Sequence, residues 1–255
     1  MQENPGAQVL ATVLTDPGRP RITWYGADGE RVELSGAVLA NWVAKTANLL
    51  VEEFDAGPGT RVLVALPVHW RSAVWALAVW RVGACVVVPM TTDDDGAGTT
   101  GQGREARPVD LVVTDRPAAH PGAQEVVAVT LAALARRFDG VLPAGAIDAA
   151  AAVMTYSDRL GWVPETEPEQ PALLAGGQAT SHSALAGAAR TTTASGARVL
   201  LTGAGLETTL TQVLAVLTTA GSVVLLDDTT ATGLRSDAAR RAALVAAERV
   251  TVDLL

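Results

Sequence analysis

The stretch Ala56–Pro67, with the sequence AGPGTRVLVALP, decides the fold of this chain. Its Gly57-Pro58-Gly59 triplet is a turn signal, and the run Arg61-Val62-Leu63-Val64-Ala65-Leu66 predicts a buried strand. Pro67 ends the strand because proline cannot donate a ladder hydrogen bond. A turn followed by a buried strand implies a sheet that other elements must cover.

The flanking segments alternate between strand and helix patterns. On the N-terminal side, 21–25 and 31–34 surround Ala27-Asp28-Gly29 and predict a hairpin, and Ser35 can cap a helix that runs to about Phe54. Such alternation predicts an α/β fold with mostly parallel sheets and flanking helices. Further strands are expected at 84–88, 109–114, 126–129, 171–175, 198–202 and 250–255; further helices at 71–81, 131–138, 147–154 and 183–190; a helix-strand-helix unit at 207–248; and a loop at 91–108.

An acidic, proline-rich stretch from Pro164 to Pro171 marks the best candidate for a boundary. We therefore expect a first α/β subdomain at residues 1–165 and a second at residues 166–255.

Composition and charge exclude several classes of function. The net charge is -8 and the arginines are scattered, which argues against a nucleic-acid partner. Cys85 is the only cysteine and lies in an apolar run, so we expect a buried thiol and no internal disulfide. With one cysteine and three histidines, no metal-ligand spacing is present.

The distribution of apolar residues predicts a cytoplasmic protein. The N-terminus is polar and has no signal-peptide pattern. The most apolar window, Val74 to Met90, is interrupted by Arg81 and Gly83 and is too short for a membrane span.

Three segments in order resemble the opening of the AMP-forming acyl-activating enzymes, which include acyl-CoA synthetases, peptide-synthetase adenylation domains and luciferases. Val32-Glu33-Leu34-Ser35 is similar to the family's first strand, and Ala56–Pro67 to its "G-D-r-V-a-l-x-l-P" segment. Leu77–Pro89 is similar to the element ending in "G-A-x-x-v-P". The resemblance implies the fold of the N-terminal part of the adenylate-forming large domain.

The resemblance also implies a phosphate loop, "T-S-G-T-T-G-x-P-K-G", directly after the strand that begins at Pro171. The chain instead continues Ala175-Gly176-Gly177-Gln178-Ala179-Thr180-Ser181-His182, so the loop is read as deleted. Gly176, Gly177, Ser181 and His182 are then the vestige of an ATP or AMP site. A histidine of many acyl-CoA synthetases is likewise replaced by Thr202.

The family's remaining catalytic elements are expected to be missing. The sequence ends before the "Y-G-x-T-E" element, the ribose-binding aspartate and the small C-terminal domain with the adenylation lysine. Lys45 is the only lysine and lies on the first long predicted helix. We therefore expect no catalytic residue, no metal site and no cofactor.

One other motif predicts a nucleotide site. Gly203-Ala204-Gly205 follows a predicted strand and opens a helix, and the next strand ends at Asp227. Gly203, Gly205 and Asp227 would form a dinucleotide fingerprint, except that Thr208 replaces the third glycine. A tight strand-helix turn is the structural alternative.

The leading hypothesis is a non-catalytic relative with an interaction or regulatory role. The alternatives are a subunit of a split acid–thiol or adenylate-forming ligase completed by a second chain, and a dinucleotide-binding protein. We also expect a protein partner or self-association through the half after Pro171, because six apolar side chains there would lack cover: Val213, Leu214, Val216, Leu217, Leu244 and Val245.

Overall fold

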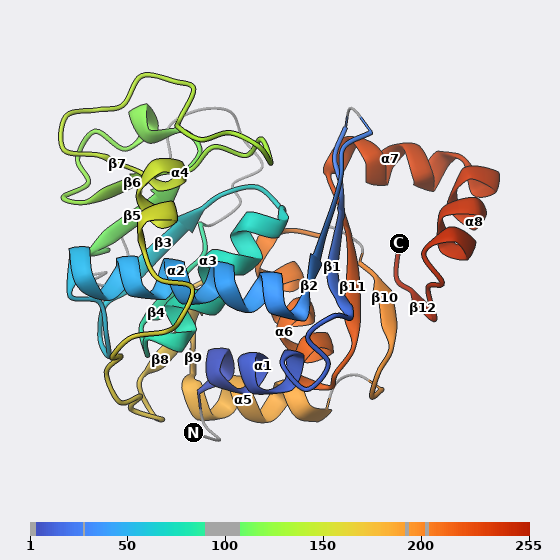
Figure 1. Cartoon of the computed structure of the whole chain (residues 1–255), viewed down its shortest axis with the longest axis horizontal. Helices are drawn as coiled ribbons and strands as arrows, with labels where there is room; N and C mark the ends of the chain where they lie inside the picture. Colours follow the sequence, from blue (N-terminus) through green and yellow to red (C-terminus); the bar gives the residue numbers. More distant parts are fainter. Residues whose placement is uncertain (1–3, 28, 90–107, 192–193, 202–203) are drawn as a thin grey trace.

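The structure, a computed structural model, describes residues 4–27, 29–89, 108–191, 194–201 and 204–255. These residues form two β-sheets with helices packed between them (Figure 1). Most neighbouring strands run parallel, so the predicted α/β fold is confirmed. The expected loop at 91–108 lies almost entirely outside the described residues.

The larger sheet has seven strands in the order β7-β6-β5-β3-β4-β8-β9. The decisive strand β3 lies inside this sheet and pairs in parallel with β4 and β5. Only the last pair, β8 and β9, is antiparallel among these neighbours. The strands are β3 (Arg61–Ala65), β4 (Cys85–Val87), β5 (Leu111–Thr114), β6 (Val126–Ala128), β7 (Ile147–Asp148), β8 (Pro171–Ala175) and β9 (Gln178–Ser181).

The smaller sheet has five strands in the order β12-β10-β11-β1-β2. Its strands are β1 (Pro20–Tyr25), β2 (Arg31–Ser35), β10 (Arg198–Leu200), β11 (Ser222–Leu226) and β12 (Val252–Asp253). Strands β1 and β2 form the predicted hairpin. Because β1 pairs with β11, the sheet contains segments from both ends of the chain. The expected boundary after residue 165 therefore does not coincide with the division between the sheets.

Helix α6 lies between the sheets and contacts three other helices, α1, α3 and α5 (Figure 1). The helices are α1 (Pro5–Val13), α2 (Gly36–Phe54), α3 (Trp70–Arg81), α4 (Ala149–Ala152), α5 (His182–Thr191), α6 (Leu206–Thr218), α7 (Asp228–Ser236) and α8 (Ala238–Ala247), with 3-10 turns η1 (Pro117–Ala119) and η2 (Val153–Thr155). None of the described helices is long and apolar enough to cross a membrane.

The expectation that α6 lacks cover is wrong. Val213, Leu214, Val216 and Leu217 are at most 2% exposed. They belong to one core cluster that includes side chains from both sheets, such as Val62 and Val223, so α6 is a central helix. Leu244 and Val245 of α8 are only partly buried, against a small second cluster on the other face of the five-stranded sheet.

Helix α1 was not predicted from the sequence. Asn4 caps it by accepting the backbone N–H of Ala7 at 2.7 Å, and Pro5 occupies the first turn. The amide of Asn4 also donates to the carbonyl of Trp80 at 2.8 Å, at the end of α3. A Cβ on Gly6 would meet Leu77 O and Arg81 N at 2.6 Å, so only glycine permits this approach of α1 to α3.

The prediction of a helix at 131–138 is also wrong, because backbone groups of this segment form hydrogen bonds with side chains outside it. Arg71 donates to the carbonyls of Ala132 and Ala133, and the backbone N–H of Phe138 donates to Asp148 Oδ2 at 2.8 Å. Leu134 is 94% exposed, so the segment offers no apolar face for packing. The helix expected at 147–154 begins later, after strand β7.

Candidate functional site

The segment that replaces the expected phosphate loop is a closed hairpin. Strands β8 and β9 pair antiparallel, with Ala175 opposite Gln178. Gly176 and Gly177 form the two-residue turn, with φ values of +53° and +77°. Positive φ at both central positions is typical of the type I′ turn, which closes hairpins tightly. Two turn residues leave no extended run of backbone amides to surround a triphosphate.

Ser181 and His182 join this hairpin to α5. His182 is fully buried, and its Nε2 donates to the carbonyl of Gly83 at 3.1 Å. Burial lowers the pKa of His182, so its imidazole is neutral at pH 7. Ser181 Oγ accepts the backbone N–H of Ala184 at 3.2 Å in the first turn of α5. Both side chains therefore hold the start of α5 in place.

Gly205 and Asp227, two of the three alternative dinucleotide residues, lie at a topological switch point. Strands β10 and β11 are parallel neighbours, but α6 lies on one face of their sheet while α7 and α8 lie on the other (Figure 1). Ligands of open α/β sheets bind at the carboxyl ends of such strand pairs. Gly205, with φ +95°, begins α6 at this edge, and Asp227 follows β11 there. Gly203 lies outside the described residues.

The carboxylate of Asp227 already accepts a hydrogen bond at this edge. Its Oδ1 accepts the backbone N–H of Thr230 at 2.6 Å, which caps α7. Gly205 has no side chain to cap α6, and a Cβ added there would meet no atom within 4 Å. The structure thus brings Gly205 and Asp227 to one edge of the sheet, and it assigns the carboxylate a helix-capping contact.

A buried ionic network around Glu248 was missed by sequence reasoning. Glu248 is 7% exposed and pairs with Arg198 and with Arg31, the latter at 3.0 Å. Tyr25 donates its hydroxyl hydrogen to Glu248 Oε1 at 2.5 Å. These partners come from β1, β2, β10 and the end of α8, which are far apart in the sequence. No local pattern could therefore have indicated the network.

Glu248 remains ionised over a wide pH range. Burial alone would raise its pKa, but the hydrogen bonds from Arg31, Tyr25 and Arg198 outweigh burial and lower the pKa to about 2. Arg198 also donates to Thr23 Oγ1 at 3.0 Å and to Ser222 Oγ at 3.2 Å. The network therefore fixes the C-terminal end of α8 to the five-stranded sheet.

Other buried ionisable groups are poorly suited to proton transfer near pH 7. Burial lowers the pKa of His69 to about 3, with a further contribution from Arg71. His69 caps α3, where its Nδ1 accepts the backbone N–H of Arg71 at 3.1 Å. Burial raises the pKa of the Cys85 thiol to about 11, in keeping with the expected structural thiol. The described residues contain no group of three or more potential metal ligands.

Lys45 also has a structural role. Its ammonium donates to the carbonyl of Tyr156 at 2.5 Å. One turn later, Asn48 donates to the carbonyls of Ser157 and Arg159 and accepts the backbone N–H of Gly161. Helix α2 thus holds the segment that follows η2, and Lys45 is one of its anchors.

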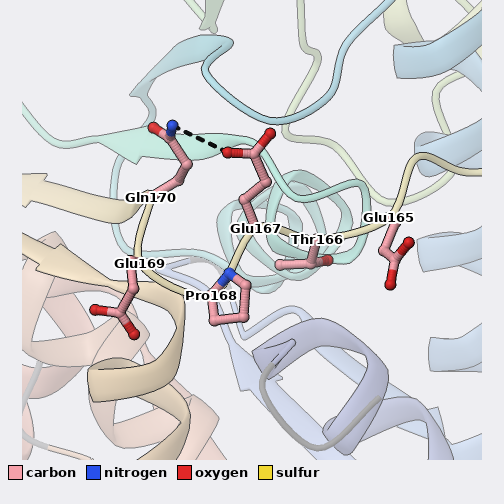
Figure 2. A pocket seen from close by; sticks show the side chains of 6 residues that line it. All are labelled: Glu165, Thr166, Glu167, Pro168, Glu169 and Gln170. Atoms are coloured by element: carbon pink, nitrogen blue, oxygen red, sulfur yellow. Dashed lines mark hydrogen bonds between the residues drawn. The ribbon is translucent and has the colours of Figure 1, made fainter.

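A hollow of about 610 Å³ lies along residues 165–170. These residues belong to the acidic stretch expected at the boundary. Figure 2 shows that the side chains of Glu165, Glu167 and Glu169 point in different directions. Gln170 hydrogen-bonds Glu167, and Ser183 hydrogen-bonds Glu169. Because the carboxylates do not converge, the hollow is not built as a cation site.

Solved structures share this fold. An amide bond synthetase from Marinactinospora thermotolerans matches with a TM-score of 0.70 and 21% identity, over 100% of this chain and 48% of its own length. An acyl-CoA synthetase from Brucella canis gives a TM-score of 0.68 and 20% identity, over 88% of this chain and 43% of its own. An acetoacetyl-CoA synthetase from Streptomyces lividans gives a TM-score of 0.66 and 20% identity, over 88% of this chain and 38% of its own length.

A curated relative is closer in sequence. A protein of Mycobacterium tuberculosis (strain ATCC 25618 / H37Rv), described by a family designation that names no activity, is 40% identical over 164 residues. These residues make up 64% of this chain and 63% of that protein, so the match spans less than two thirds of the relative. No protein-family model matches the sequence. The expected fold of adenylate-forming enzymes is thus confirmed, and the match spans less than half of each solved enzyme named above.

Proposed function

We propose that this chain, which has the fold of part of the AMP-forming acyl-CoA synthetases and amide bond synthetases, is a non-catalytic relative with an interaction or regulatory role. The observation that carries the proposal is the hairpin turn at Gly176-Gly177. Adenylate formation depends on a loop that positions the ATP phosphates and stabilises their charge. The hairpin occupies the place where the resemblance implies that loop, and it offers neither the amides nor a lysine.

An exchange assay tests this proposal. The purified chain should give no ATP–pyrophosphate exchange with short, medium, long or aromatic carboxylic acids, relative to a heat-treated control. Exchange by the chain alone would overturn the non-catalytic assignment.

A split ligase completed by a second chain is the second candidate function. The observation that favours it is the likeness of fold to an acyl-CoA synthetase and an amide bond synthetase, with TM-scores of 0.68 and 0.70. Exchange that appears only when a separately expressed C-terminal domain is added would support this candidate. That result would replace the regulatory role with a catalytic one.

The switch point at β10 and β11 favours a third candidate, dinucleotide binding. Its test is thermal denaturation with NAD, NADP and FAD at millimolar concentration. A melting temperature that rises with one dinucleotide, and that no longer does so in Gly205→Ala, would support this site. We expect no such rise, because Asp227 is engaged in capping α7.

The surface for the proposed partner or second copy is the end of the five-stranded sheet formed by β12 and α8. Strand β12 is one of the two edge strands of this sheet and pairs only with β10 among the described residues. Val252 and Leu254 are 37% and 40% exposed, and α8 has no buried residue. An edge strand with exposed apolar side chains favours pairing with another chain.

A further inference from the structure

A small cavity lies at the carboxyl edge of the seven-stranded sheet. It measures about 20 Å³, and its walls include three tryptophans, Trp42, Trp70 and Trp75. Thr46, Arg71 and Thr130 supply the polar side chains of the lining besides the tryptophans. The cavity lies where α3 begins after β3 and where the chain leaves β6, the edge at which open α/β sheets bind ligands.

Arg71 brings a buried positive charge to this cavity. The residue is 7% exposed, and its guanidinium lies 4.3 Å from the Trp70 ring centre and 5.4 Å from that of Trp42. One terminal nitrogen, Nη2, donates to the carbonyls of Ala132 and Ala133 at 3.1 and 3.3 Å. Arg71 takes part in none of the ion pairs formed by the described residues, and Glu30 acts on it only at longer range. A buried guanidinium with no carboxylate in direct contact is only partly compensated for its lost hydration.

Two hydrogen-bond donors on residues that line the cavity have no hydrogen-bond partner among the described residues. They are Nε of Arg71 and Nε1 of Trp70, and both atoms are buried. Trp70 as a whole is 2% exposed. Buried N–H groups are almost always paired in folded proteins, so two unpaired donors on neighbouring residues indicate an acceptor that binds them.

We propose that this cavity binds one compact monovalent anion, such as a halide or formate, through Arg71 Nε and Trp70 Nε1. The anion supplies a counter-charge in direct contact with the guanidinium and an acceptor for the two donors. One water molecule needs a cavity of about 10–15 Å³. A cavity of about 20 Å³ therefore has room for a halide and is too small for nucleotides and phosphate esters. The site is separate from the Gly176-Gly177 hairpin and does not depend on the proposed function.

Bromide is the probe, because its anomalous scattering distinguishes it from water. Crystals soaked in sodium bromide should show an anomalous peak within contact distance of Arg71 Nε and Trp70 Nε1. In solution, the melting temperature should rise with sodium bromide along a saturable curve at constant ionic strength, with sodium gluconate as the bulky replacement anion.

Three variants assign the effect to the site. Trp70→Phe keeps the ring and removes one donor, so apparent affinity should fall about tenfold. Arg71→Met should abolish saturation, whereas Arg136→Met, at an exposed arginine, should behave as the wild type. Trp70→Phe decides the matter if Arg71→Met does not fold.

The proposal is overturned if no anomalous peak appears at the cavity, since water then satisfies the donors. It is also overturned if bromide and gluconate stabilise the wild type equally. Equal bromide dependence in the wild type and Trp70→Phe would contradict the assigned contacts.

Discussion

Glu248 shows how a single residue can hold a peripheral element in place. Its carboxylate accepts hydrogen bonds from Tyr25, Arg31 and Arg198, which belong to three strands of one sheet. Because Glu248 lies directly after α8, these bonds attach that helix to the sheet, together with the ion pair between Arg241 and Asp253. A helix with no buried residue depends on such an attachment more than a core helix does.

The pH dependence of stability should report this attachment. The folded-state pKa of Glu248 is about 2, below the ordinary value of 4.5, so its contribution is full above the unfolded pKa and is lost as pH falls from about 4.5 to 2. We expect the ionised carboxylate to contribute on the order of 1–3 kcal/mol to the free energy of unfolding. This is less than the full pKa shift implies, because solvent near the surface screens the charge. Urea denaturation at several pH values measures it.

The matched variant is Glu248→Gln, which keeps the shape of the side chain and removes the charge. At pH 7 it should lower the free energy of unfolding by about 2–4 kcal/mol, because Arg198 loses its carboxylate partner. Its stability should also fall less steeply between pH 4.5 and 2. A variant with the wild-type slope would show that other carboxylates cause the acid sensitivity.

At the scale of elements, the docking of α1 on α3 depends on one glycine. Gly6→Ala would place a Cβ 2.6 Å from Arg81 N and Leu77 O, both backbone atoms that cannot turn away. We expect a loss of about 2–4 kcal/mol in the free energy of unfolding. Gly18→Ala is the control, because a Cβ there meets nothing within 4 Å. Equal effects of the two substitutions on denaturation midpoints would refute this close packing.

The turn between β8 and β9 gives a second prediction for an element. Gly177→Ala forces a residue with a side chain to adopt φ +77°, which should cost about 1 kcal/mol. Gly122→Ala, at a glycine without positive φ and with open space around it, should be near neutral. Thermal denaturation of both variants measures the difference. A neutral Gly177→Ala would show that the turn is not closed as described.

The regular elements could be predicted because their signals are local. The β3 run, the Ser35 cap of α2 and the hairpin of β1 and β2 each depend on neighbouring residues. The cover of α6 and the partners of Glu248 could not be predicted, because they join segments far apart in the sequence. Helix α1 did carry a local signal, the Asn4-Pro5 cap, which the polar N-terminus obscured.

For the candidate site, the sequence located the segment but not its shape. The sequence shows that the phosphate-loop motif is absent after β8, whereas the hairpin follows from positive φ at two adjacent glycines. The Arg71 cavity is lined by tryptophans from both α2 and α3, so no single segment of the sequence indicates it. A cavity between two helices depends on how they pack, so the sequence of neither helix predicts it.

At the scale of the whole molecule, the free edge of the five-stranded sheet determines the expected association. Static light scattering at tens of micromolar should show a dimer if β12 pairs with a second copy. Leu254→Lys should shift the chain to monomer by placing a charge beside the edge, whereas Val38→Lys, a comparably exposed site on α2, should not. A wild-type monomer, or equal effects of both substitutions, would contradict self-association through this edge.

The central proposal is that this chain does not bind ATP, because a closed hairpin stands where the resemblance implies a phosphate-binding loop. Isothermal titration calorimetry of the purified chain with Mg-ATP tests the claim most directly, because it needs no acyl substrate and no second chain. The account predicts no saturable heat up to millimolar nucleotide, since the Gly176-Gly177 turn offers no phosphate-binding loop. Saturable binding that the Gly177→Ala variant weakens would contradict it and would restore a nucleotide site at the hairpin.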